Sequence, residues 1–102
     1  GGRGVEDMAP DAFRLIEELS FGGIWSRPGL DTRSRSICMI TALAVMGKEE
    51  QLRSHIRVGL NVGLKQQEIV EIMLQLVMYA GLPCAVQGLK AAKEVFAARA
   101  RP

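Results

Sequence analysis

The chain has 102 residues, a formal net charge of +2 and a hydrophobic content of 48%. This length suits one domain, and so small a net charge gives no indication of nucleic-acid binding. The most apolar run, residues 37–46, is too short to span a membrane, so no membrane partner is expected. We predict a flexible lead at residues 1–9 and a single domain at 10–102. A cytoplasmic location is expected because no signal-peptide pattern, a charged start followed by an apolar run, precedes Met8.

Apolar residues recur at helical spacing along the chain, and no stretch alternates as a half-buried strand does. Prolines and Asp31 predict helix starts, whereas glycines predict helix ends. The sequence therefore predicts a compact all-α fold of about five helices joined by short loops. The expected helices run from Pro10 to near Gly22 and Gly23, from Asp31 to 46, between Gly47 and Gly63, from a restart at residues 64–67 to Gly81, and from Pro83 to about 101.

The run at residues 37–46 has no polar face beyond Thr41. A helix that is apolar all round must be covered on every side, and four other short helices give thin cover. We therefore expect other subunits to complete its burial. Cys38 and Cys84 are too few for a disulfide scaffold and form no Cys-x-x-Cys pair, so we expect them to be small buried apolar residues.

His55 is the chain's only histidine and the first candidate for acid–base chemistry near neutral pH. Leu52, Ile56 and Leu60 form one apolar stripe on the predicted third helix, and His55 lies at the border of this stripe. A pocket wall would occupy such a border, although a histidine making one structural hydrogen bond would fit equally. No carboxylate stands beside it at ligand spacing, so no metal site is expected.

Arginines are concentrated in the middle of the chain. Between Arg27 and Arg57 there are six basic residues against three acidic ones. Guanidinium groups bind carboxylates bidentately, so this excess favours a small anionic ligand; ordinary ion pairs on a solvated face are the alternative. Arg33 and Arg35 fall in the first turn of the second helix, where cations oppose the helix dipole. They indicate a bound carboxylate or an acidic neighbour.

Three further residues are candidates for the site. Trp25 lies in the Pro- and Gly-containing loop 21–30, where it either packs as an anchor or belongs to the site. Gln75 and Tyr79 are four residues apart on one margin of the fourth helix. Facing His55, they would form a small cleft; a buried ring with a satisfied hydroxyl is the alternative for Tyr79.

Several motifs occur together: Ile24-Trp-Ser-Arg-Pro-Gly-Leu-Asp-Thr-Arg-Ser-Arg-Ser36, Leu52-Arg-Ser-His-Ile-Arg57, Asn61-Val-Gly63 and Tyr79-Ala-Gly-Leu-Pro83. From about Phe21 to Phe96 the chain resembles the gamma-carboxymuconolactone decarboxylase family of the alkylhydroperoxidase-D-like superfamily. The resemblance implies a helical fold assembled as a ring-like hexamer or trimer. It also implies a decarboxylation without any cofactor, in the protocatechuate branch of aromatic catabolism (the beta-ketoadipate pathway).

The resemblance also implies roles for particular residues. The family's histidine corresponds to His55, its tyrosine to Tyr79, and its arginine-rich helix start to Arg33 and Arg35. We therefore expect His55 to transfer a proton, the two arginines to hold the carboxylate of a small acid, and Tyr79 or Gln75 to donate to the developing anion. Trp25 is included among the substrate-binding candidates.

The chain departs from the family pattern at several positions. Lys48 and Gln51 stand where peroxidase relatives have a Cys-x-x-Cys pair, so no peroxidase cycle is expected. Val62, Lys65 and Val86 replace an asparagine, a threonine and an asparagine. These departures keep open a decarboxylase-like tailoring enzyme or lyase that acts on another small acid.

Two alternatives belong to other classes of protein. Residues 61–69 resemble the turn of a DNA-binding helix-turn-helix, but the following helix carries Glu68, Glu71 and no arginine, which disfavours phosphate contact. The other alternative is an oligomeric scaffold without catalytic activity, which would assemble but bind no acid near Arg33 and Arg35.

Overall fold

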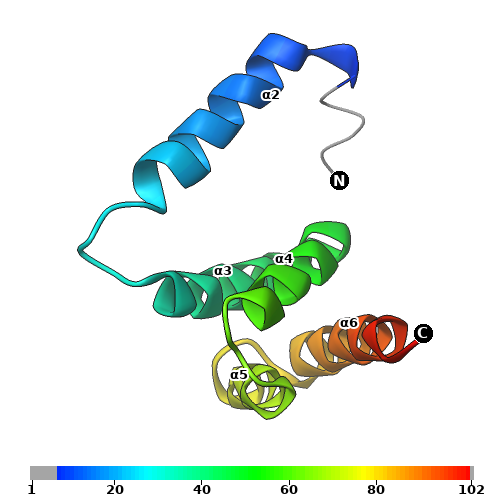
Figure 1. The fold of residues 1–102 in the computed structure, drawn as a ribbon. Coiled ribbons are helices and arrows are strands. Elements are labelled where there is room, and N and C mark those ends of the chain that lie inside the picture. Colours follow the sequence, from blue (N-terminus) through cyan, green and yellow to red (C-terminus); the bar gives the residue numbers. More distant parts are fainter. Residues whose placement is uncertain (1–6, 102) are drawn as a thin grey trace.

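The computed structural model describes residues 7–101, and within this range the regular elements are all helical. The all-α prediction of five helices is therefore confirmed, with η1 continuing the first of them. No described helix combines the length and the apolar character needed to cross a membrane. In chain order the elements are α2 (Pro10–Glu17), η1 (Glu18–Ile24), α3 (Thr32–Met46), α4 (Glu49–Asn61), α5 (Gln66–Tyr79) and α6 (Leu82–Ala100) (Figure 1).

Local sequence signals explain where these helices begin and end. Asp31 Oδ1 accepts a hydrogen bond of 2.7 Å from the backbone N–H of Ser34, which caps α3 and lowers the pKa of the Asp31 carboxyl. Gly47 and Gly63 have φ values of 71° and 106°, in the left-handed region that terminates α3 and α4. These predicted boundaries are confirmed. Of the predicted lead at 1–9, residues 1–6 lie outside the described range, residues 7 and 8 are helical, and Ala9 precedes α2.

Helices α3 to α6 pack together into a four-helix unit, in which α5 contacts α6, α4 contacts α3 and α6, and α3 contacts α5. On α5 the apolar side chains of Ile69, Met73 and Leu76 face the core, whereas Val77 is 43% exposed. Val77 lies on a side of α5 that the other described helices leave uncovered. The largest fully buried apolar side chains are Ile40, Ile56, Ile69, Met73 and Val95.

Replacing Ile56 with alanine should destabilise the four-helix unit. The Ile56 side chain is 0% exposed, so its truncation removes buried apolar surface and leaves a cavity between α4 and its neighbours. Such truncations cost about 2–5 kcal/mol in the free energy of unfolding. Urea unfolding followed by circular dichroism measures the change. The exposed Gln51→Ala on the same helix is the control, with an expected change within about 0.5 kcal/mol.

Residues 10–24, formed by α2 and η1, make a helical arm that stands apart from the four-helix unit (Figure 1). The two segments pack on each other, but neither packs extensively on α3 to α6. The radius of gyration is 14.3 Å, larger than the roughly 13 Å expected for a compact chain of this length. The arm reaches away from the chain's own core, and this separation creates the space in which the candidate site lies.

The outer face of α3 is only partly covered by the other described residues, in keeping with the thin cover expected from one chain. Val45 and Met46 are 53% and 58% exposed, and Cys38 is also exposed, so the apolar run is not covered on every side within one copy of the chain. The expectation that Cys38 is buried is wrong, because the end of the arm approaches this face but leaves an open cavity beside the Cys38 side chain. Cys84 is half-buried and its thiol donates a hydrogen bond of 3.4 Å to the Ala44 carbonyl oxygen.

Candidate functional site

A cavity of about 330 Å³ lies where the end of the arm approaches the outer face of α3. Its walls are almost entirely apolar, and its one charged lining residue is Arg35. An apolar cavity with one well-placed guanidinium suits a small carboxylic acid. We call it the Trp25–Arg35 pocket; it is lined by Ile24, Trp25, Leu30, Arg35, Cys38, Met39 and Ala42.

Arg35 is held in place by the loop that joins the arm to α3. Its Nε donates to the Leu30 carbonyl oxygen at 2.9 Å, and its Nη2 donates to the Arg27 carbonyl oxygen at 3.2 Å. These bonds use two of the five N–H donors of the guanidinium. Other donors are left for a ligand carboxylate, so Arg35 both fixes the loop and keeps its charge at the pocket wall.

Trp25 is positioned by the end of η1. Its backbone N–H donates to the Ser20 carbonyl oxygen at 2.7 Å, and its ring lies 5.8 Å from that of Phe21, centroid to centroid. The half-buried indole therefore packs against the arm and also lines the pocket. The two interpretations offered by the sequence, packing anchor and site residue, are both compatible with this position.

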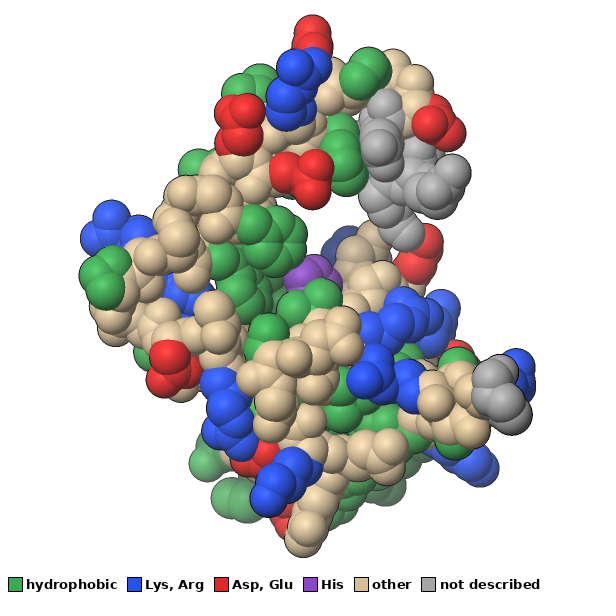
Figure 2. All heavy atoms as spheres, in the orientation of Figure 1, with side chains coloured by type: hydrophobic (Ala, Val, Ile, Leu, Met, Phe, Trp, Pro, Cys, Tyr) green, Lys and Arg blue, Asp and Glu red, His purple; other side chains and the backbone are tan. Residues whose placement is uncertain are grey.

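His55 lies on α4, which packs against both α3 and α6. Figure 2 shows the imidazole at the floor of the hollow between the arm and the four-helix unit, beside apolar side chains. The ring is half-buried, and among the described residues its Nδ1 is buried without a hydrogen-bond partner. Because Nδ1 is itself covered, a ligand in the hollow could reach the half-buried imidazole only at its exposed edge, and His55 is not among the residues that line the Trp25–Arg35 pocket.

Burial lowers the pKa of His55, because the charged imidazolium is desolvated. The free protein therefore holds a neutral ring at neutral pH, with one nitrogen as donor and the other as acceptor. A neutral imidazole can accept a proton at once. The approach of an anionic ligand would raise its pKa again and make the protonated form accessible.

The pH dependence of stability should reflect this burial. A histidine whose folded pKa lies below its unfolded value of about 6.5 binds more protons when unfolded, so stability falls as pH drops through 6.5 toward the folded pKa. The untagged protein has one histidine, so an NMR titration of the imidazole C–H signals should give a pKa below 6.5. The His55→Gln variant should lose this part of the pH dependence of unfolding.

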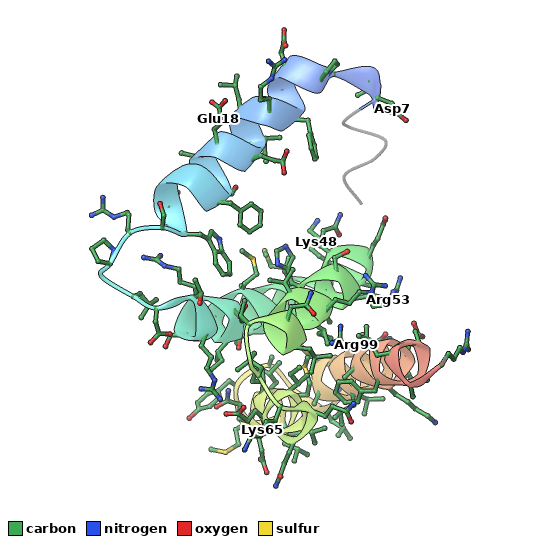
Figure 3. The ribbon with its side chains drawn as sticks, in the orientation of Figure 1. Asp7, Glu18, Lys48, Arg53, Lys65 and Arg99 are labelled. Carbon is green, nitrogen blue, oxygen red and sulfur yellow. The ribbon has the colours of Figure 1, made fainter. Side chains whose placement is uncertain are left out.

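Arg33 and Gln75 lie on another side of the four-helix unit. Arg33 pairs with Glu68 of α5, and this bond lowers the pKa of the Glu68 carboxyl. Glu68 also accepts the Lys65 backbone N–H at 2.9 Å, and Figure 3 places Lys65 on the side away from the arm. Gln75 lines a groove of about 490 Å³ that also contains Glu68 and Glu71. Carboxylates in this groove disfavour an anionic ligand.

The spacing of the two arginines explains why they separate. Residues two apart on a helix point about 200° from each other, so Arg33 and Arg35 cannot both face one ligand from a regular α3. The structure brings Arg35 together with Trp25 and directs Arg33 to Glu68. The sequence indicated either a bound carboxylate or an acidic neighbour beside these cations at the helix start. For Arg33 the acidic neighbour is Glu68.

Tyr79 is the last residue of α5, and its side chain is 77% exposed. The helices that carry Tyr79 and His55, α5 and α4, do not pack extensively on each other. One copy of the chain therefore does not form the predicted cleft between them. No group of three or more His, Cys, Asp or Glu side chains among the described residues could hold a metal ion.

Several pocket residues were not anticipated as site residues. Cys38, Met39 and Ala42 come from the apolar run of α3. Ile24 is the last residue of η1, and Leu30 lies in the loop that joins the arm to α3. The sequence did contain a signal for these residues, because a helix without a polar face must be covered by other groups on every side. Periodicity alone could not distinguish a subunit contact from a ligand cavity on that face.

Comparison with known proteins identifies the family. The model of the carboxymuconolactone decarboxylase family matches residues 10–94. A 4-carboxymuconolactone decarboxylase of Acinetobacter baylyi is 37% identical over 92 residues, which cover 90% of this chain and 69% of that protein. An uncharacterized 15.0 kDa protein of Paracoccus denitrificans is 35% identical over 97 residues, covering 93% and 72% of the two chains.

A more distant relative is also named as a decarboxylase. The nitrosuccinic acid decarboxylase of Metarhizium robertsii is 34% identical over 77 residues, which cover 74% of this chain and 52% of that protein. The chain thus spans about half the length of this relative. The family match includes the arm, the joining loop and most of the four-helix unit. The chain therefore belongs to the carboxymuconolactone decarboxylase family.

Proposed function

We propose that this protein is a cofactor-independent decarboxylase of a small carboxylic acid, with gamma-carboxymuconolactone as the first candidate substrate. Two observations carry the proposal: the apolar Trp25–Arg35 pocket with its one guanidinium, and the half-buried imidazole of His55 at the floor of the hollow under the arm. This arrangement combines a proton-transfer group, an anchor for an anion and low polarity, which a decarboxylation requires.

The proposed reaction breaks the bond between the substrate carbon and its carboxylate. The bonding electrons remain on the carbon as an anion spread over the unsaturated ring, and CO₂ departs. His55, protonated in the complex with the anionic substrate, delivers its proton to a carbon over which this charge is spread and recovers one from solvent. Arg35 holds a carboxylate that the substrate retains, and the apolar wall disfavours the localised charge of the departing carboxylate relative to the delocalised anion.

The departures from the family pattern bear little on this pocket. Val62, Lys65 and Val86 are not among its lining residues, so the differences at these positions leave its walls unchanged. The positions of the two cysteines support the expectation that the protein runs no peroxidase cycle. Cys38 lines the Trp25–Arg35 pocket, whereas Cys84 lines a separate cavity between α3 and α6, so the two thiols do not share a site.

A second candidate keeps the chemistry and changes the acid. The relative from Metarhizium robertsii is named for nitrosuccinic acid, so the family includes a decarboxylase named for a different acid. One guanidinium in an apolar pocket recognises a carboxylate without specifying a lactone ring. This chain would then be a tailoring enzyme or lyase on another small acid.

The test is to incubate the untagged protein separately with gamma-carboxymuconolactone, nitrosuccinate and hydrogen peroxide plus a dithiol. Release of CO₂ from the lactone, with one deuterium incorporated at carbon in D₂O, is expected, and peroxide consumption is not. Release from nitrosuccinate alone would favour the second candidate. If neither acid releases CO₂, the proposed decarboxylation of these acids is wrong.

A further inference from the structure

The described residues leave two separate apolar surfaces uncovered. The arm surface has side chains that are 47–65% exposed, and the corner surface, at the turn from α5 to α6, has side chains that are 43–78% exposed. Several large apolar side chains left exposed close together in the chain indicate a binding partner. The arm surface consists of Leu15, Ile16, Leu19, Phe21 and Ile24, and the corner surface consists of Leu74, Val77, Met78, Tyr79 and Leu82.

A single chain cannot join its own two surfaces. In Figure 1 helices α3 and α4 lie between the arm and α5, and the arm makes no extensive contact with α5 or α6. We propose that the corner surface of a second copy of this chain docks in the hollow under the arm, against the arm surface. Repeated from copy to copy, this one contact covers both surfaces, whereas an arm-to-arm contact would leave every corner surface uncovered.

The charges of the arm and of the rest of the chain favour the same pairing. Residues 7–24 carry four acidic side chains and one basic one, and residues 25–101 carry eleven basic side chains and six acidic ones. On α6, Lys90 and Lys93 continue the line of Leu82 and Val86 at helical spacing, so basic groups extend one edge of the corner surface. An acidic arm is therefore attracted to the basic flank of a second copy.

Docking in this way also completes the candidate site. Tyr79 is part of the corner surface, and His55 lies at the floor of the hollow that the corner enters. Each hollow would then combine His55 and Arg35 of one copy with Tyr79 of the partner subunit. The phenol could donate a hydrogen bond to the developing anion. This last step depends on the proposed function, whereas the docking does not.

The docking is tested by light scattering on Leu19→Asp, which alters the arm surface, and Met78→Asp, which alters the corner surface. Both side chains are well exposed, at 63% and 78%, so the four-helix unit should stay folded, as circular dichroism verifies. The wild-type chain should be oligomeric and each variant monomeric. An equimolar mixture should form a heterodimer, because one variant retains an intact corner and the other an intact arm.

Three results would overturn the docking: a monomeric wild type, a variant that assembles like the wild type, or two monomeric variants that do not pair when mixed. The last result would indicate that the arm surface binds the arm surface of another copy, and the corner surface another corner surface. Gln67→Asp, an exposed change on α5 outside both surfaces, is the matched control and should assemble normally. Loss of assembly in this control would also count against the proposal.

The shared site is tested by co-expressing His55→Ala with Tyr79→Phe. If the two side chains come from different copies, mixed assemblies contain sites with both, and about one quarter of wild-type turnover should return. No recovery from two inactive parents would place both residues in one chain and refute the shared site. Full activity of Tyr79→Phe alone would refute the role of Tyr79 and leave the docking result unaffected.

Discussion

His55→Ala is expected to lower kcat for decarboxylation by about 10²–10⁴-fold, the range that a well-placed proton-transfer group contributes. The imidazole borders the hollow, its Nδ1 is buried without a partner among residues 7–101, and its pKa is lowered by burial. Alanine removes the chain's only imidazole and leaves the lining of the Trp25–Arg35 pocket unchanged, because His55 is not part of that lining. Steady-state CO₂ release measures the effect, and circular dichroism with light scattering verifies that helicity and assembly are kept.

The comparison variants separate proton transfer from packing. His55→Gln keeps a polar side chain of similar reach but has no nitrogen that exchanges a proton near neutral pH, so it should be as slow as the alanine variant. Gln51→Ala, one turn earlier on α4 and exposed, should keep wild-type turnover. Wild-type kcat in His55→Ala would remove this histidine from the mechanism, whatever the substrate.

The local features of the fold were predictable from the sequence because neighbouring residues determine them. Asp31 caps α3 through its own side chain, and Gly47 and Gly63 adopt the left-handed conformation that ends a helix. The buried stripe of α5 follows from a period of 3.6 residues. The position of the arm could not be predicted in this way. The arm makes no extensive contact with α3 to α6, so no pattern within the chain determines its direction.

The candidate site was predictable only in part, for two physical reasons. Charge excess indicated an anion site but not its location, and the separation of Arg33 from Arg35 depends on Glu68, which is 35 residues away in the chain. Cys38 was expected in the core because a cysteine usually packs as a small apolar residue. It instead lines the pocket wall, because the apolar run of α3 extends to an outer face that the arm leaves open.

Arg35→Leu is expected to raise KM by about 10- to 100-fold, which corresponds to the roughly 1.5–3 kcal/mol of hydrogen bonds to a charged group. Arg35 is the one charged residue of the Trp25–Arg35 pocket, so leucine would leave the substrate carboxylate without a counter-charge. Arg35 also bonds the Leu30 and Arg27 carbonyl oxygens, so part of the effect can come from a loosened loop. The emission of Trp25, the only tryptophan, reports on the loop directly.

Arg33→Leu is the matched control, because it removes the same charge two residues earlier on the same helix. Arg33 pairs with Glu68 in an exposed ion pair, and such pairs contribute little, so its loss should change KM by less than about twofold. Arg35→Lys should recover part of the affinity through its charge but not the two carbonyl bonds, since an ammonium lacks the planar fork of a guanidinium. If Arg33→Leu raised KM as much as Arg35→Leu, the substrate carboxylate would have to lie near α5, and the pocket beside Trp25 would not be the binding site.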